Sequence, residues 1–161
     1  MAITVLLVEG HEILRQGIAV LLEQEADIEV IGEVGDGGQA LGVVVRLCPD
    51  VVIMDVTMPN LNGLDTTRKI VWQLPSTRVI ALSLDSDRHF VEDAFRAGAS
   101  AYLHKECLSD ELVRAIRKVL DGETYLSPSA ASGILGHCPK GVSLNSSGLR
   151  AAPTERERKG L

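Results

Sequence analysis

Short apolar runs alternate with segments of helical periodicity along the first 122 residues of this 161-residue chain. The apolar runs lie at residues 3–8, 28–34, 51–55, 78–83 and 101–104, and each is followed by a segment in which apolar side chains recur at helical spacing. Parallel strands need a long crossover connection, usually a helix, so repeated strand–helix units are typical of a parallel sheet. The sequence therefore predicts a doubly wound α/β domain with helices on both faces of the sheet.

The composition is that of a globular domain with an aliphatic core, since hydrophobic residues make up 45% of the chain and aromatic residues only 3%. The net charge of −6 argues against binding of nucleic acid or an anionic membrane by charge alone. The apolar start of the chain is too short to span a membrane and lacks the features of a signal peptide. Cys48, Cys107 and Cys138 have no metal-like spacing and are expected to be reduced thiols. We therefore expect a cytoplasmic protein without a membrane partner.

Asp55 ends the most apolar of these runs and precedes a turn rich in Pro, Asn and Gly. The carboxyl ends of parallel strands form the edge at which ligands bind in open α/β sheets. Glu9, Ser83 and Lys105 stand at the ends of three other predicted strands and are expected at the same edge. Two acids, a hydroxyl and an ammonium group fit a site for a phosphoryl group, with a carboxylate as nucleophile and an acid-bound divalent cation to neutralise charge.

Each of these residues also has a purely structural interpretation. Asp55 can cap the following turn and Glu9 can cap a helix, while Ser83 can belong to a strand-end turn and Lys105 can be a solvated charge. Taken alone, Asp55 favours the structural interpretation. Because four such residues at one sheet edge are much less expected by chance, the set favours a functional site.

The motifs around these residues resemble the receiver domain of bacterial response regulators. The resemblance rests on Asp55 followed by Met58-Pro59 and Gly63, on Ser83 after an apolar strand, and on Lys105 after residues 98–104. It covers residues 1–122. It implies a flavodoxin-like, five-stranded parallel sheet in the order 2-1-3-4-5, with the site at the switch between the first and third strands.

Two further segments, residues 11–17 and 121–128, are similar to the NarL/FixJ class, in which a LuxR-type helix-turn-helix domain follows the receiver. Residues 153–158 resemble the opening of that DNA-binding domain. We therefore expect a receiver domain at 1–122, a linker at 123–152 that begins with a short helix near 129–135, and the start of a truncated helix-turn-helix domain at 153–161. DNA contact is expected only through the output domain missing from this chain.

The resemblance implies a two-component response regulator that controls transcription and is not an enzyme. Asp55 is implied to accept a phosphoryl group from a sensor histidine kinase, and Lys105 to pair with the phosphate. A Mg²⁺ ion is implied to be held by Glu9, Asp55 and the backbone carbonyl of Thr57. A homodimer is a further implied state.

The resemblance also implies a conformational switch, in which Ser83 follows the phosphate inward and Tyr102 changes its rotamer. The surface around the fourth helix and the fifth strand would then change. Tyr102 is equally consistent with a half-buried aromatic residue of a strand, and the sequence does not separate these two interpretations.

The chain departs from the family pattern after the first strand, where family members usually carry two consecutive acids and this chain reads Glu9-Gly10. Gly10 has no side chain to bind Mg²⁺, so we expect weakened metal binding and slower phosphorylation. An alternative function is a phosphorylation-independent pseudo-receiver that acts in protein interaction or dimerisation. A flavodoxin-like enzyme is less expected, because no flavin phosphate loop follows the first strand and no nucleophile–histidine pair is evident.

Overall fold

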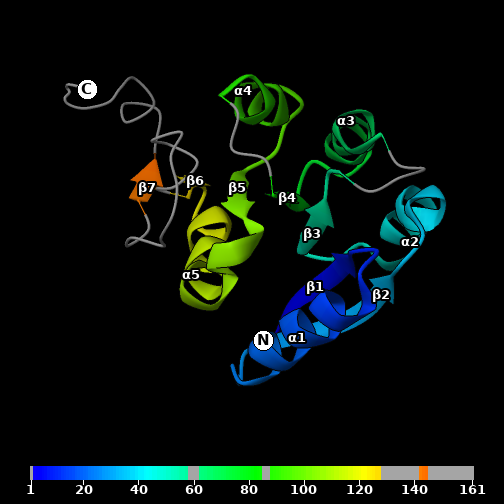
Figure 1. The fold of residues 1–161 in the computed structure, drawn as a ribbon. Coiled ribbons are helices and arrows are strands. Elements are labelled where there is room, and N and C mark those ends of the chain that lie inside the picture. Colours follow the sequence, from blue (N-terminus) through cyan, green and yellow to red (C-terminus); the bar gives the residue numbers. More distant parts are fainter. Residues whose placement is uncertain (1, 58–61, 85–87, 128–141, 145–161) are drawn as a thin grey trace.

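Seven strands form the sheet at the centre of the computed structural model, which describes residues 2–57, 62–84, 88–127 and 142–144 (Figure 1). The strands are β1 (Ile3–Val8), β2 (Ile28–Val34), β3 (Val51–Asp55), β4 (Arg78–Ser83), β5 (Ala101–His104), β6 (Thr124–Leu126) and β7 (Val142–Leu144). Their order is β2-β1-β3-β4-β5-β6-β7. All neighbouring pairs are parallel except β6 and β7, which are antiparallel. The predicted order 2-1-3-4-5 is confirmed, and the prediction of five strands is wrong.

Helices cover both faces of the sheet, as predicted (Figure 1). They are α1 (Glu12–Glu23), α2 (Ala40–Leu47), α3 (Gly63–Gln73), α4 (Arg88–Arg96) and α5 (Leu108–Leu120), with short 3-10 helices η1 (Gly37–Gln39) and η2 (Lys105–Cys107). The helices α1 and α5 pack on one face, and α2, α3 and α4 pack on the other. None of the helices in the described part of the chain is long and apolar enough to cross a membrane.

The core has one layer on each face of the sheet, and the two layers alternate along every central strand. In β1, Val5 and Leu7 pack with α1 and α5, whereas Leu6 and Val8 pack with α2 and α3. All four side chains are fully buried. Burial on both faces explains why the sequence shows continuous apolar runs here rather than an alternation of apolar and polar residues.

The sixth strand is held by a buried polar contact with α5. Tyr125 is fully buried, and its hydroxyl donates a hydrogen bond of 3.1 Å to the Glu111 carboxylate. The Ser127 hydroxyl donates to the same carboxylate at 3.4 Å. Burial, with the nearby charge of Glu111, raises the pKa of Tyr125 to about 12, so the phenol keeps its proton at neutral pH. A strand of three residues is too short to form a recognisable apolar run, which is why it was not predicted.

The predicted linker at 123–152 contains both β6 and β7. The predicted short helix at 129–135 and the predicted output-domain segment at 153–161 lie outside the described residues, as do Met58-Pro59 and Cys138. Cys48 is free and exposed, as expected, but Cys107 is disulfide-bonded, so the prediction of reduced thiols is wrong for that residue. Spacing along a sequence does not show which thiols a fold brings together.

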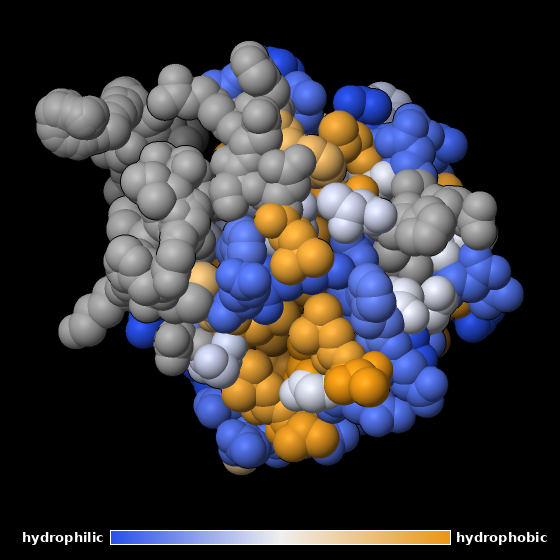
Figure 2. Space-filling model, in the orientation of Figure 1, coloured by the Kyte–Doolittle hydropathy of each residue, from blue (hydrophilic) through white to orange (hydrophobic). Residues whose placement is uncertain are grey.

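Apolar side chains also gather on the surface over α1, beside α5 (Figure 2). Ile13 and Val20 of α1 are 86% and 58% exposed. A groove between the two helices is lined by Leu14, Ile18 and Leu21, and it opens next to Lys105. The sheet edge that carries the predicted site therefore borders an apolar surface.

Gly63, the first residue of α3, lies in close contact with the backbone of Val56, the residue after Asp55. A Cβ atom on Gly63 would lie 2.5 Å from the Cα atom of Val56, and real side chains do not approach a backbone so closely. Asn62 caps the same helix by accepting a hydrogen bond from the backbone N–H of Asp65. The first position of α3 therefore requires glycine for lack of space beside Val56.

We expect Gly63→Ala to lower the free energy of unfolding by about 1–3 kcal/mol, because the added methyl group forces the turn and α3 apart. The matched control is Gly17→Ala, an exposed site in the middle of α1 with nothing within 4 Å of the new methyl group. That change should stabilise the fold by about 0.5–1 kcal/mol. Urea unfolding of both variants measures the two values, and equal effects would contradict the packing argument.

Candidate functional site

The predicted site residues stand at the carboxyl edge of the parallel sheet. Glu9 follows β1 directly, Asp55 ends β3, Ser83 ends β4, and Lys105 begins η2 directly after β5. The strand order places β3 between β1 and β4, with β5 beyond β4. Glu9, Asp55 and Lys105 meet in one buried cluster. We call these three residues and the neighbouring His11 the acidic pocket.

Lys105 is the cation of the acidic pocket. Its Nζ atom lies 2.7 Å from Oδ2 of Asp55 and 3.1 Å from Oε1 of Glu9. The three side chains are only 5%, 3% and 1% exposed. Buried carboxylates are costly unless a cation and hydrogen bonds compensate them, so one ammonium group here offsets the charge of two acids. The ammonium and the two carboxylates together leave a formal charge of −1.

Asp55 is held in its ionised form. Its Oδ1 atom accepts hydrogen bonds from the backbone N–H of Thr57 at 2.9 Å and from the Thr57 hydroxyl at 2.6 Å. Burial acts to raise the pKa of this carboxyl group, but the hydrogen bonds from Lys105 and Thr57 outweigh burial and hold the pKa below its ordinary value of 3.8. Asp55 is therefore a carboxylate at neutral pH, as a nucleophile must be.

Thr57 enters the site through its hydroxyl and its amide, whereas the sequence predicted a role only for its carbonyl oxygen. An Asp followed two residues later by Thr is a recurrent local hydrogen-bonding pattern, and that spacing was the available signal. Both contacts orient Asp55 from the first turn after its strand. They also leave Oδ2 directed at Lys105.

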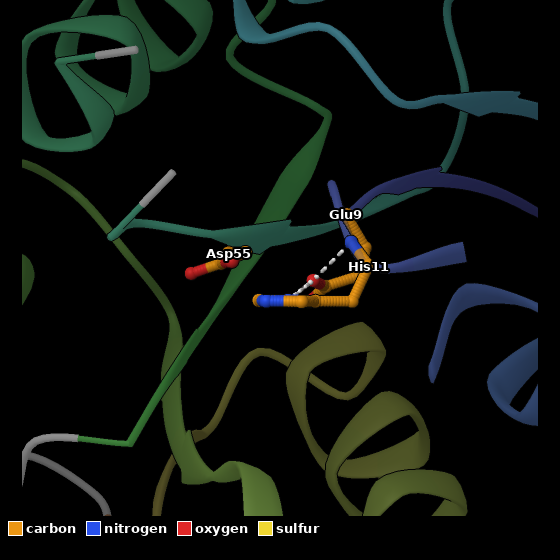
Figure 3. Close-up of side chains that lie close together, drawn as sticks. All are labelled: Glu9, His11 and Asp55. Carbon is orange, nitrogen blue, oxygen red and sulfur yellow. Dashed lines mark hydrogen bonds and ion pairs between the residues drawn. The ribbon is translucent and has the colours of Figure 1, made fainter. Parts of the chain in front are cut away.

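His11 is a member of the pocket that sequence reasoning missed. Its backbone N–H and its ring Nδ1 atom lie 3.0 Å and 2.9 Å from the same oxygen, Oε2 of Glu9. Figure 3 shows the imidazole reaching from the loop after β1 toward Asp55. The signal was present in the sequence, because His11 stands two residues after Glu9, beside the glycine that replaces the usual acid.

The loop that carries Glu9 is fixed from its other side by Arg15. The guanidinium of Arg15 donates to the backbone carbonyl of Glu9 at 2.7 Å and to the Glu33 carboxylate of β2 at 3.1 Å. These contacts tie the loop to α1 and to the edge strand. The Glu9 carboxylate is therefore presented from a constrained backbone.

The donor atoms of the pocket fit a divalent cation. One ligand atom each from Glu9, His11 and Asp55 lies within 4.8 Å of the others. Within the described part of the chain, Oε1 of Glu9 is buried and has no directed hydrogen bond, although the Lys105 ammonium is 3.1 Å away. A buried anionic oxygen with unused lone pairs is what a bound cation would satisfy.

Ser83 and Tyr102 belong to β4 and β5, the two strands that follow β3 in the sheet. Ser83 is fully buried at the end of β4 and stands opposite His104 of β5 in the strand register. Tyr102 is fully buried, and its ring meets the ring of Phe90 of α4 edge to face with centroids 6.4 Å apart. Tyr102 is therefore not the half-buried strand residue of the structural interpretation, and its role as a switch stays a prediction.

Comparison with known proteins places these features in one context. Residues 5–117 match the family model of the response regulator receiver domain. The chain is 37% identical over 153 residues to the transcriptional regulatory protein LiaR of Bacillus subtilis, covering 95% of this chain and 70% of that protein. It is 32% identical over 133 residues to the transcriptional regulatory protein DegU of Brevibacillus brevis, covering 83% of this chain but only 56% of that protein.

A solved structure shares the architecture as well as the sequence pattern. A two-component response regulator of the LuxR family from Aurantimonas sp. SI85-9A1 superposes with a TM-score of 0.77 at 33% identity. The superposition covers 82% of this chain and 94% of that one. The similarity therefore extends over most of this chain.

Proposed function

Because this chain belongs to the response regulator receiver family, in its NarL/FixJ class, we propose that Asp55 accepts a phosphoryl group from a sensor histidine kinase to switch a transcription-regulating output. The observation that carries the proposal is the buried, ionised Asp55 at the carboxyl end of β3, paired with Lys105 at 2.7 Å. Receiver domains are signalling proteins, and the transfer of the phosphoryl group is the signal.

The chemistry proposed for Asp55 is nucleophilic substitution at phosphorus. A carboxylate oxygen of Asp55 forms a bond to the phosphorus atom while the bond from phosphorus to the donor's histidine nitrogen breaks, which gives an acyl phosphate and a histidine that takes up a proton. Lys105 supports this step because its ammonium group already contacts Oδ2 and can stabilise the oxygens of the incoming group. Thr57 keeps the carboxylate oriented.

The proposed ligands of Mg²⁺ are Glu9, Asp55 and the Thr57 carbonyl. The Oε1 atom of Glu9 supports this proposal, because it is buried and accepts no hydrogen bond from a described residue. The ion would supply positive charge that offsets repulsion between a carboxylate and an anionic phosphoryl donor. The lack of a carboxylate at Gly10 would weaken that binding.

Ser83 and Tyr102 are the proposed switch. Phosphorylation of Asp55 would draw the Ser83 hydroxyl toward the new phosphate oxygens and free space behind it for Tyr102. Because Tyr102 packs against Phe90 of α4, a change in its rotamer would alter the surface formed by α4 and β5. The switch is a two-state element biased by one added local charge.

The wider role is a proposal too, because the chain spans 56% and 70% of the lengths of DegU and LiaR. We propose that residues 123–152 link the receiver to an output domain whose opening resembles residues 153–161. DNA would then be bound only through that output domain, with the receiver as a site of homodimerisation. A cytoplasmic location is part of the same proposal.

The experiment that tests the proposed function is phosphorylation by acetyl phosphate in the presence of Mg²⁺, followed by mass spectrometry of the intact chain. One added phosphoryl group that is lost in Asp55→Asn supports the proposal. An unmodified chain that nonetheless binds Mg²⁺ would contradict it.

We expect Gly10→Asp to tighten Mg²⁺ binding by about tenfold or more, equivalent to about 1.4 kcal/mol, and to speed phosphorylation of Asp55. The added carboxylate supplies an oxygen ligand beside Glu9. Gly10 is not one of the two described glycines with positive φ, which are Gly98 and Gly122, so an aspartate can adopt its backbone conformation. Calorimetric titration of both proteins measures the affinity.

Gly10→Asn is the matched control for this change, since it has nearly the shape of aspartate without its charge. It should leave the Mg²⁺ affinity within about threefold of the parent chain. Equal affinities and equal labelling rates in the aspartate variant and the parent chain would show that Gly10 does not limit the site.

A further inference from the structure

The exposed imidazole of His11 lies against the Glu9 carboxylate of the acidic pocket. The His11 side chain is 73% exposed, yet its Nδ1 atom lies 2.9 Å from Oε2 of a carboxylate that is 1% exposed. His11 is also the N-cap residue of α1, but its side chain makes no capping hydrogen bond. Its position is therefore explained by the pocket and not by the helix (Figure 3).

The second observation is the unsatisfied oxygen of Glu9. The hydrogen bonds of the Lys105 ammonium run to Oδ2 of Asp55 at 2.7 Å and to Oε2 of Glu9 at 3.4 Å. Oε1 of Glu9 is buried and accepts no directed hydrogen bond from any described residue. Oε1 also lies 3.1 Å from the Lys105 ammonium, but Asp55 shares that ammonium. A cation between Glu9, His11 and Asp55 would satisfy the lone pairs that this buried oxygen has left.

We propose that His11 is a ligand of this cation site and occupies the role that a carboxylate at position 10 would fill. The ligand set is then one imidazole nitrogen with the carboxylates of Glu9 and Asp55. Imidazole suits Zn²⁺, Ni²⁺ and Cu²⁺, whereas Mg²⁺ and Mn²⁺ prefer oxygen ligands, which Mg²⁺ takes in a near-octahedral arrangement. The chain therefore binds a first-row transition-metal dication in preference to Mg²⁺.

This inference rests on the proposed function only in placing a cation beside Asp55. It differs from the family's oxygen-only set because Gly10 offers no side chain, which leaves the imidazole nitrogen of the adjacent His11 as the third ligand. The exposure of the ring leaves the site open to solvent on the His11 side, so the ion can exchange. The three donor atoms already lie within 4.8 Å of one another.

The test is calorimetric titration of the full, untagged chain with Mg²⁺, Mn²⁺ and Zn²⁺, each salt alone. The parent chain should bind one Zn²⁺ per molecule at least about tenfold more tightly than Mg²⁺, and also more tightly than the oxygen-preferring Mn²⁺. His11→Ala should lose about tenfold or more in Zn²⁺ affinity and less than about threefold in Mg²⁺ affinity. His11→Gln keeps a polar side chain beside Glu9 without an imidazole, and it should behave like the alanine variant.

Two further measurements show whether His11 binds the metal or only lies beside it. Glu9→Gln should weaken both Mg²⁺ and Zn²⁺, because it removes the buried carboxylate that either ion would need. The electron paramagnetic resonance spectrum of bound Cu²⁺ should show coupling to nitrogen in the parent chain and lose it in His11→Ala. Circular dichroism of each variant checks that the fold is intact.

Unchanged Zn²⁺ affinity in His11→Ala, or equal losses for Zn²⁺ and Mg²⁺, would overturn the assignment of His11 as a ligand. Zn²⁺ binding that persists in Glu9→Gln would also overturn it, because the ion would then lie elsewhere. These titrations involve no phosphoryl donor. If Asp55 is not phosphorylated, the titrations still test whether His11 binds the metal. The two proposals can therefore be contradicted independently.

Discussion

Asp55→Asn is expected to abolish the transfer of a phosphoryl group to this chain while leaving the fold intact. Asparagine has nearly the shape of aspartate and can still accept hydrogen bonds from Thr57, but its amide is not a nucleophile at neutral pH. The loss of the charge opposite Lys105 is compensated in part by Glu9, which lies 3.1 Å from the same ammonium group. The measurement is mass spectrometry after incubation with acetyl phosphate and Mg²⁺, with labelling expected to fall to background.

Asp65→Asn is the control for the loss of an aspartate. Asp65 stands in the first turn of α3, its side chain is 43% exposed, and it pairs with Lys69 at 3.1 Å on the surface. Labelling of this variant should equal that of the parent chain. Asp50 is a poorer control, because its carboxylate accepts hydrogen bonds from the backbone and the side chain of Thr4 and so supports the sheet. Labelling that persists in Asp55→Asn would contradict the assignment of Asp55 as the phosphoryl acceptor.

The bounds of β1 to β5 could be predicted to the residue, because burial of the central strands on both faces also produces the apolar runs in the sequence. Burial on both faces requires an apolar side chain at each position, so β3 appears in the sequence as the unbroken run Val51–Met54 before Asp55. The edge strand β2 was predicted from its alternation, and Glu29 and Glu33 are indeed exposed. Hydrophobic periodicity therefore positions the sheet edge and the acids along it.

The two additional strands could not be predicted, because their stabilising contacts are not local. β6 has three residues, and it is held by pairing with β5 and by the contact of Tyr125 with Glu111, fourteen positions earlier in the chain. β7 pairs with β6 across residues 128–141 of the predicted linker. Neither contact produces a periodic pattern in the sequence.

The acidic pocket was predicted in outline and missed in detail. Topology alone brings Glu9, Asp55 and Lys105 to one edge of the sheet, and this follows from the strand order. The role of His11 depends on a side-chain rotamer in a loop, which no periodicity encodes. A sequence can therefore predict which residues meet at a sheet edge, but not which of their atoms are left without a partner.

Lys105→Met is expected to lower the free energy of unfolding at neutral pH by about 3–5 kcal/mol, the cost of leaving buried charges without their cation. The substitution removes the ammonium group and keeps an apolar side chain of similar length. Glu9 and Asp55, which are 1% and 2% exposed, would then share the pocket as two like charges. Lys69→Met is the control, since the Lys69 side chain is 56% exposed and its surface pair with Asp65 should contribute no more than about 1 kcal/mol.

The pH dependence of this loss identifies its cause. In the parent chain the pKa of Asp55 lies below 3.8, so its contribution to stability is fully present above that pH and is lost only as the pH falls through the lower, folded-state value. In Lys105→Met the burial that opposes ionisation of Asp55 in the parent is no longer outweighed, and repulsion from Glu9 adds to it. The pKa of Asp55 should therefore rise above its unfolded value. The variant then gains stability as the pH falls from 7 toward 5, whereas the contribution of Asp55 in the parent stays constant over that range.

Urea unfolding of both proteins at pH 7 and pH 5, in the presence of a chelator, measures this effect. The difference between their free energies of unfolding should be smaller at pH 5 than at pH 7. A difference in stability that is the same at both pH values would mean that the lost stability comes from the packing of the lysine stem, and that the ammonium group does not hold Asp55 in its ionised form.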